Sequence, residues 1–334
     1  MKNAPTTLLI SAENQKRVFS NGYADAIQVV EAALQRRAEG KILLPDKISV
    51  VFDESTQNRI NCMPGALLDD KLYGVKWVAV FPENPKIGYR NVTGTMILSE
   101  LEHGHTISVM DAGYLTEIRT AAVGATAAKY LSREDSESIG FIGAGQQARR
   151  HLDLVKVVRP DLKKCYVSSR TEKTVDDFIE EEKVLHPEMD FIPCGNYYEA
   201  AVNDADIIVT AISGQEDVLK ARWIKKGAFY IHVAGWEDEY DVPKSASKIV
   251  CDDWESIKHR TQTISRMYKD GLLEDAEIYG NLEEITTGKK KARENNTEFI
   301  YFCSVGLAFI DVSFAKYMYE KCSEYKFGTD FCFS

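Results

Sequence analysis

Apolar positions follow two different patterns along this chain. In the first part, short apolar runs succeed one another with turn residues between them, at 48–52, 60–63, 72–81, 94–98 and 106–110. Consecutive strands with few helices predict a mostly antiparallel sheet. One helix is expected over 18–39, where Ile27, Val30 and Leu34 share a face at helical spacing.

Further along, the pattern changes to strands that alternate with helices. Apolar runs predict strands at 139–142, 164–168, 191–193, 207–211, 229–233 and 248–251. Helical segments are expected between them, over 146–158 and 173–184. Short, fully apolar strands between helices are typical of a parallel, doubly wound sheet.

Two further helices frame the alternating region. An Ala-rich helix over 115–131 precedes it, and an apolar helix over 305–319 follows it. The order predicts an α/β protein with a Rossmann domain at 116–304 and a discontinuous α+β domain made of 1–115 and 305–334. We expect the discontinuous domain to bind substrate and to form a dimer. We expect the active site to be the cleft between the two domains.

One turn carries a specific chemical signal. The strand at 139–142 runs into Gly143-Ala144-Gly145-Gln146-Gln147-Ala148, and a helical pattern follows. This Gly-x-Gly-x-x-Ala sequence is typical of dinucleotide-binding turns, in which the backbone approaches a pyrophosphate at a helix N-terminus. A glycine fingerprint alone is weak evidence, but here the strand before it and the helix after it are both present.

The end of the second strand of this domain bears on the choice of nucleotide. An acidic residue there would bind the ribose hydroxyls of NAD, but the chain has Ser169-Arg170-Thr171 instead. Two hydroxyls and a guanidinium suit a 2′-phosphate, so NADP(H) is favoured over NAD(H). The alternative is that Arg170 lies in a solvent-exposed turn and does not bind the nucleotide.

Composition and charge exclude several classes of function. The net charge of −10 argues against nucleic acid or an anionic membrane as partner. No run reaches the roughly 18 apolar residues of a membrane span, and the first residues do not resemble a signal peptide. The seven cysteines are scattered without a Cys-x-x-Cys pair, which indicates reduced thiols, no metal site and a cytoplasmic location.

Several phrases together identify a family resemblance. They are Pro45-Asp46-Lys47, Met63-Pro64, Gly74-Val75-Lys76, the sequences at 81–85 and 116–122, the turn at 143–148, and Ser304-Val305-Gly306-Leu307-Ala308. Nearly end to end, the chain resembles the ornithine cyclodeaminase/mu-crystallin family. The resemblance implies an NAD(P)-dependent enzyme that acts on small amino or imino acids, usually as a homodimer.

The resemblance also implies substrate-binding positions. It places carboxylate-binding residues at Lys47, Lys76 and Arg119, and Lys47 departs from the arginine more usual at its position. Arg119 offers a bidentate fork, and burial would lower the pKa of Lys76 enough for it to move a proton. The alternatives are a Lys76 that points to water from an edge strand and an Arg119 that pairs with Glu117 or Asp111.

A second departure concerns the catalytic acid. Ornithine cyclodeaminases have a catalytic Asp in a Gly-Ala-Asp-x-Pro-Gly-Lys phrase, whereas this chain has Ala234-Gly235-Trp236-Glu237-Asp238-Glu239-Tyr240-Asp241. Glu237 falls nearest to that Asp and is the candidate proton carrier. The acids could instead form a solvated loop or face a cationic amine. His232, on the preceding strand, is expected to be structural, although proton transfer is open to it.

These observations favour an oxidoreductase that moves hydride between nicotinamide and the alpha carbon of a small amino or cyclic imino acid. One alternative is a cyclodeaminase-type lyase, which recycles its nicotinamide internally and releases ammonia. The other is a non-catalytic, nucleotide-binding accessory subunit similar to a tyramine oxidase subunit. The altered loop around Glu237 keeps both alternatives open.

Overall fold

The structure is a computed structural model that describes residues 6–53 and 55–333. It divides into two compact units, one that runs up to Arg119 and resumes at Gly306, and one formed by Thr120–Val305. Among the described residues, no helix is both long and apolar enough to cross a membrane. Each unit contains one eight-stranded sheet.

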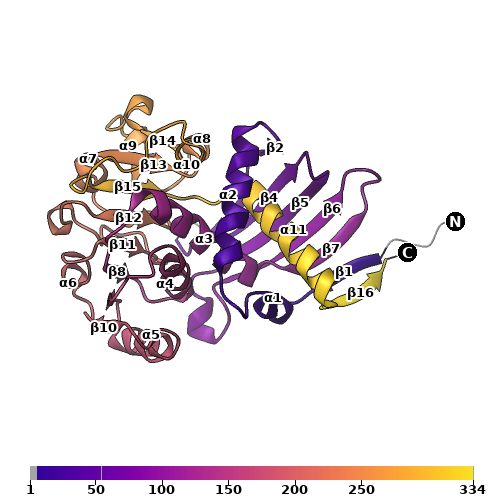
Figure 1. Cartoon of the computed structure of the whole chain (residues 1–334), viewed down its shortest axis with the longest axis horizontal. Helices are drawn as coiled ribbons and strands as arrows, with labels where there is room; N and C mark the ends of the chain where they lie inside the picture. Colours follow the sequence, from indigo (N-terminus) through magenta and orange to yellow (C-terminus); the bar gives the residue numbers. More distant parts are fainter. Residues whose placement is uncertain (1–5, 54, 334) are drawn as a thin grey trace. The chain divides into compact units, whose positions relative to one another are not determined.

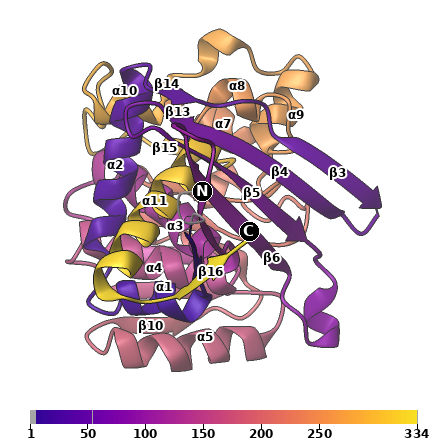
Figure 2. The ribbon, with the colours of Figure 1, turned by 90° about the vertical axis from the view of Figure 1, so that its right-hand side faces the viewer.

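The first unit is built on a mixed, mainly antiparallel sheet. Its strands, in the order in which they pair, are β16 (Thr329–Cys332), β1 (Thr6–Ile10), β7 (Thr106–Asp111), β6 (Val92–Glu100), β5 (Leu72–Val80), β4 (Asn58–Leu67) and β2 (Ile42–Leu43), while β3 (Ile48–Asp53) also pairs with β4. Among the described strands of this sheet, β1 and β7 pair in parallel and the other neighbours are antiparallel. Figure 2 shows β3 at the outer edge of this sheet, antiparallel to β4.

Two long helices cover one face of this sheet. α2 (Ala24–Ala38) and α11 (Ala308–Tyr325) lie side by side across β4 and β5 (Figure 1). α11 buries most of its first two turns against the sheet, because this part of its sequence is almost entirely apolar. The shorter α1 (Ala12–Val18) begins at Ser11, whose side chain caps it by accepting a hydrogen bond from Asn14 N–H.

The alternation of side chains along β5 decides which of them the helices cover. Leu72, Lys76 and Val78 are buried, while Tyr73 and Trp77 are exposed between them. This is the period-two pattern of a sheet with one covered face. It places Lys76 on the buried side of the sheet.

The second unit is a fully parallel, doubly wound sheet. Its strands, in the order in which they pair, are β10 (Asp190–Pro193), β9 (Lys164–Ser168), β8 (Ser138–Ile142), β11 (Ile207–Thr210), β12 (Phe229–His232), β15 (Ile300–Cys303), β13 (Lys248–Cys251) and β14 (Gly280–Asn281). The main connecting helices are α4 (Gln146–Val158) and α5 (Glu172–Leu185). Shorter helices follow: α6 (Tyr198–Val202), α7 (Asp241–Ser245), α8 (Trp254–Ile257), α9 (Thr263–Lys269) and α10 (Leu282–Thr286), with single 3-10 turns at Asn84–Ile87, Ala221–Trp223 and Asp275–Glu277. The strand order reverses between β8 and β11, because β9 and β10 lie on one side of β8 and β11 and β12 lie on the other. Such sheets bind ligands at this position.

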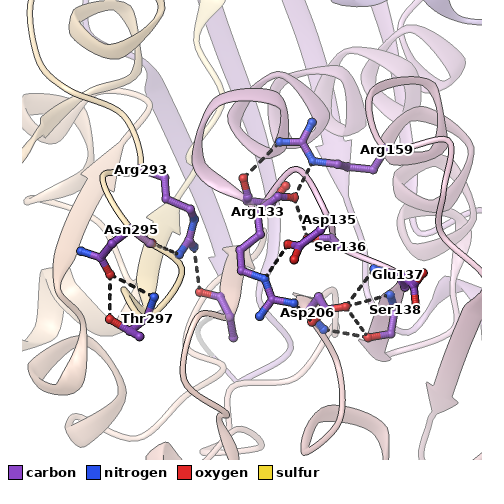
Figure 3. Close-up of polar contacts among 12 residues, drawn as sticks. Arg133, Asp135, Ser136, Glu137, Ser138, Arg159, Asp206, Arg293, Asn295 and Thr297 are labelled. Carbon is purple, nitrogen blue, oxygen red and sulfur yellow. Dashed lines mark hydrogen bonds and ion pairs between the residues drawn. The ribbon is translucent and has the colours of Figure 1, made fainter.

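Two arginines anchor the end of α3 (Gly113–Leu131). Arg159 Nη2 donates to the carbonyl oxygens of Ala128 and Ser132, at 3.0 and 3.1 Å, and Arg293 Nε donates to Leu131 O at 2.8 Å. Arg133 pairs with Asp206 at 2.8 Å in the same cluster (Figure 3). Cations at a helix C-terminus satisfy carbonyl groups that lack partners within the helix and interact favourably with its dipole.

The structure differs from the predicted elements in a few places. The helix expected over 18–39 is α2, which begins only at Ala24 because the chain turns at Gly22 with φ +113°. The preceding α1 was not expected. The strands that were not expected include β1, β15 and β16. The Ala-rich and apolar helices are α3 and α11.

Candidate active site

The glycine turn has the geometry that its sequence predicts. Gly143 has φ +102°, and a Cβ there would lie 2.5 Å from the carbonyl oxygen of Ala211, so no other residue fits. Gly145 is the N-cap of α4, and a Cβ there would meet nothing within 4 Å. Ala148 is fully buried, which lets α4 pack closely on the sheet.

These features make the start of α4 a place where a phosphate could bind. No side chain caps this helix, so its first N–H groups have no side-chain acceptor at the N-cap. Open space at Gly145 and the positive end of the helix dipole suit a pyrophosphate. Gln146 is exposed and Gln147 half-buried beside it, while Ala144 is buried and its carbonyl accepts from Arg149 Nη1 at 2.6 Å.

The three residues after β9 do different things. Thr171 is the N-cap of α5 and its hydroxyl contacts Thr174 Oγ1 at 2.7 Å, so that hydroxyl is engaged locally. The backbone N–H of Ser169 donates to Gly195 O at 2.8 Å, while Arg170 is exposed. A role in binding a 2′-phosphate therefore depends mainly on Ser169 and Arg170 and stays a prediction.

A buried cluster of charges joins two of the predicted substrate-binding residues in the first unit. Lys76 and Asp311 are fully buried, and Lys76 Nζ donates to Asp311 Oδ1 at 2.7 Å. Arg119 Nε lies 3.0 Å from the same oxygen, and only 7% of Arg119 is exposed. Two cations thus share one carboxylate, and all three side chains are buried or nearly so.

Burial controls the charge of Lys76. Desolvation, and then the positive charge of Arg119, lower the pKa of Lys76 from 10.5 to about 8, while Asp311 acts in the opposite direction. A lysine with such a pKa can both bind an anion and move a proton near neutral pH. The alternative of an edge lysine that points to water is wrong, because Lys76 is on the covered face of a central strand.

Gly306 makes room for the Arg119 fork. This residue has φ +78°, and a Cβ there would lie 2.3 Å from Arg119 Nη1 and 3.0 Å from its Nη2. The guanidinium therefore lies directly against a position that only glycine leaves open. Lys47 is half-buried in the loop before β3, three residues after Leu44, which packs against Met63 and Ala308.

Glu237 is a buried carboxylate that links two strand ends in the second unit. Its Oε1 accepts from Ile212 N–H at 2.8 Å, and its Oε2 accepts from Thr210 Oγ1 at 2.8 Å and Ala234 N–H at 3.1 Å. Burial raises the pKa of Glu237, and these hydrogen bonds oppose that shift. These hydrogen bonds hold the loop that follows β12 against the end of β11. A catalytic role for Glu237 stays a prediction.

Asp238 belongs to a second buried network beside Glu237. Its Oδ1 accepts from Thr263 Oγ1 at 2.8 Å and from Tyr301 OH at 3.3 Å, and His232 Nε2 lies 3.3 Å away. Burial raises the pKa of Asp238 well above its usual range and lowers that of His232 to about 3. The imidazole is therefore neutral, as expected of a structural histidine. The alternative of a solvated acidic loop is wrong for Glu237 and Asp238, since both are fully buried.

Sequence reasoning missed Asp311, the residue that organises the cationic cluster. Its signal was present, since an acid in the first turn of an otherwise apolar helix face needs a buried partner. The sequence could not identify that partner, because Lys76 lies 235 positions away.

Comparisons with known proteins agree with this architecture. The model of the ornithine cyclodeaminase/mu-crystallin family matches residues 11–326. A Δ1-pyrroline-2-carboxylate reductase of Bacillus cereus is 31% identical over 324 residues, which are 95% of this chain and 97% of that protein.

Two solved structures share the whole fold. A Δ1-pyrroline-2-carboxylate reductase of Thermococcus litoralis, in complex with NADH and L-proline, superposes with a TM-score of 0.91 at 32% identity, over 97% of this chain and 99% of that one. A dimeric archaeal alanine dehydrogenase with bound NAD gives 0.88 at 30% identity, over 98% and 100% of the two chains. These matches confirm the predicted family and fold class, and they support the predicted class of enzyme.

Proposed function

The chain belongs to the ornithine cyclodeaminase/mu-crystallin family, and from that premise we propose that it is an NAD(P)H-dependent reductase of a cyclic α-imino acid. Δ1-Pyrroline-2-carboxylate, with L-proline as the product, is the first candidate substrate. The observation that carries the proposal is the buried pair of cations, Lys76 and Arg119, around a single carboxylate.

The charge of this cluster suits a small monocarboxylate. Protonated Lys76, Arg119 and ionised Asp311 leave one positive charge in excess inside a buried site. An unbalanced buried charge is costly, so an anionic group that enters is favoured. Arg119 supplies the planar fork that matches a carboxylate, and we propose that Lys47 adds a third, more mobile positive charge from its loop.

Lys76 is also the proposed proton donor. Reduction of a cyclic imine adds a hydride to carbon and a proton to nitrogen, and the bound nicotinamide supplies the hydride. With its pKa near 8, Lys76 is protonated at neutral pH and still acidic enough to give up the proton. Glu237 is the second candidate, and its three hydrogen bonds predict that its first task is to position the loop after β12.

The second unit supports nucleotide binding at Gly143–Ala148. We propose that the pyrophosphate lies at the start of α4 and that Ser169 and Arg170 contact the adenosine ribose. NADP(H) is the preferred nucleotide in this proposal, although the two related structures described above contain NADH and NAD.

A panel of substrates tests the proposed reaction. Δ1-Pyrroline-2-carboxylate, its six-membered homologue, and pyruvate with ammonia are offered with NADH or NADPH, and the reaction is followed at 340 nm. L-Ornithine is assayed in parallel for ammonia release. We expect net NAD(P)H consumption with a cyclic imine, and Arg119→Ala should lower kcat/KM at least about tenfold through loss of a charge-assisted hydrogen bond.

Two other outcomes identify the alternatives. Ammonia release from ornithine without net change at 340 nm indicates the cyclodeaminase. Tight nucleotide binding without turnover of any amino or imino acid indicates the accessory subunit. Either result refutes the proposed reductase.

We also propose a homodimer that forms through the first unit. The sheet face opposite α2 and α11 exposes a row of apolar side chains that pair across strands: Ile48 next to Cys62, and Cys62 next to Trp77. Ile48 is 62% exposed and Trp77 52%, which is unusual for large apolar residues in a row. α11 was expected to help, but its apolar residues are already buried in its own unit.

The oligomeric state is measured by light scattering. Trp77→Glu should convert the dimer into a monomer of 37.6 kDa, because it places a charge in the proposed interface. A wild-type monomer at micromolar concentration contradicts the proposal.

A cytoplasmic location is proposed as well, since no disulfide joins any of the seven cysteines in the described residues.

A further inference from the structure

Asp311 is a carboxylate that contacts both cations of the candidate site. It lies in the first turn of α11 and is fully buried. One of its oxygens, Oδ1, lies 2.7 Å from Lys76 Nζ and 3.0 Å from Arg119 Nε. Its other oxygen, Oδ2, accepts no hydrogen bond from the described residues. Asp311 is thus a fixed anion shared by two elements, β5 and α3.

The surroundings of Lys76 leave Asp311 as the main stabiliser of its charge. From α3 comes Arg119, which repels a protonated Lys76, and from α11 comes Asp311, which attracts it. The cross-strand neighbours of Lys76 are Met63 on β4 and Met96 on β6, and neither carries a charge. Without Asp311, two buried cations would face each other.

We propose that Asp311 is a positioning residue of this site, which fixes Lys76 Nζ and the Arg119 guanidinium in place and holds Lys76 in its protonated form. The inference rests on the proposed function, since it assigns to Asp311 the upper pH limit of the reduction. Asp311 does not contact the substrate in this account. It acts through the two cations that do.

The consequence is a link between one carboxylate and the alkaline limit of activity. In the wild type, kcat/KM should fall above the pKa of Lys76, which is about 8. An opposite charge within about 4–6 Å shifts a pKa by roughly one to three units. Asp311→Asn removes that charge and keeps the shape, so the alkaline limb should move at least about one unit toward acid.

The experiment compares pH profiles of kcat/KM for Δ1-pyrroline-2-carboxylate in the full-length wild type, Asp311→Asn and Asp311→Glu. We expect Asp311→Asn to shift the alkaline limb and to lower kcat/KM at pH 8 at least about fivefold, because a pKa that falls from about 8 to about 7 leaves about one tenth of Lys76 protonated in place of one half. Asp311→Glu keeps the charge, so its limb should stay near that of the wild type even where its rate is lower. NADH affinity, measured by fluorescence, should stay within about twofold in all variants, because the nucleotide-binding residues are untouched.

Two controls separate a charge effect from a general loss of structure. Glu320→Gln removes an exposed carboxylate from the same helix and should leave the profile unchanged. In a Lys76→Met background, Asp311→Asn should cause no further shift of the limb, because the group that titrates is gone. If Asp311→Asn does not fold, Asp311→Glu tests the inference. An alkaline limb that is displaced in Asp311→Glu then overturns the inference.

Failure of the inference can be told from failure of the proposed function. An Asp311→Asn enzyme whose activity falls equally at every pH has lost only structure, and the inference is then wrong. A wild type that does not reduce the imine refutes the proposed function instead. In that case the pH dependence of L-proline binding to the NAD⁺ complex, compared between wild type and Asp311→Asn, still decides the role of Asp311.

Discussion

Gly306→Ala separates the shape of the candidate site from the stability of the fold. The new methyl group would lie 2.3 Å from Arg119 Nη1, whereas ordinary contacts begin at 3.4 Å. The guanidinium must therefore move by about 1 Å, and a displacement of that size can cost about a hundredfold in rate. We expect kcat/KM for the imine to fall by about 10- to 100-fold.

The cost in stability should be small, because the atom that must move is the far end of a flexible side chain. What remains is the left-handed backbone, with φ +78° at Gly306, which costs an L-residue about 1–2 kcal/mol. At about 2–4 °C for each kcal/mol, the Tm should fall by only a few degrees. NADH affinity should not change.

A matched variant supplies the control. Gly40 has φ +71°, and a Cβ there meets nothing within 4 Å. Gly40→Ala therefore carries the same backbone strain without the clash, and it should lower the Tm to a similar extent while leaving kcat/KM intact. Similar kcat/KM values for the two variants would show that the Arg119 fork is not needed for the reaction.

Three further changes test other parts of the structure. Arg170→Ala should weaken NADPH binding more than NADH binding in fluorescence titrations, and an equal effect on both contradicts the proposed 2′-phosphate contact. Glu237→Gln places an amide N–H group against one of the donors from which Glu237 accepts a hydrogen bond, so the free energy of unfolding in denaturant should fall by about 1–3 kcal/mol. If Glu237 also moves a proton, kcat should fall more than KM rises. Burial and the nearby Asp153 raise the pKa of Glu182 from 4.5 to about 7, so the folded state binds more protons in this window and the free energy of unfolding should decrease as pH rises through it. Glu182→Gln should flatten that slope in urea titrations, and an unchanged slope would contradict the assignment.

Local patterns predicted the second unit better than the first. The helix over 146–158 and the strands at 164–168 and 248–251 were predicted to the residue, because short buried strands and a helix that follows a glycine turn carry strong local signals. The prediction missed β15, although this strand is fully buried. Four apolar residues after a long loop do not show by periodicity whether they form a buried strand or part of a buried helix.

Non-local pairing explains what the sequence could not show in the first unit. β16 is exposed at all four positions, and it is a strand only because it pairs with β1 at the other end of the chain. The candidate site has the same property. The family resemblance supplied Lys76 and Arg119, but the carboxylate between them comes from a helix near the C-terminus.

The pairing of the two chain ends also sets an order for synthesis on the ribosome. Residues 120–305 are contiguous, so the nucleotide-binding unit can fold once they have emerged. The first unit has by then been exposed for longer, but it still lacks α11 and β16, which follow the second unit in the chain. Until α11 emerges, β4 and β5 lack the helix that packs against their apolar face. Lys76 can be buried beside its carboxylate partner only once Asp311 arrives with α11.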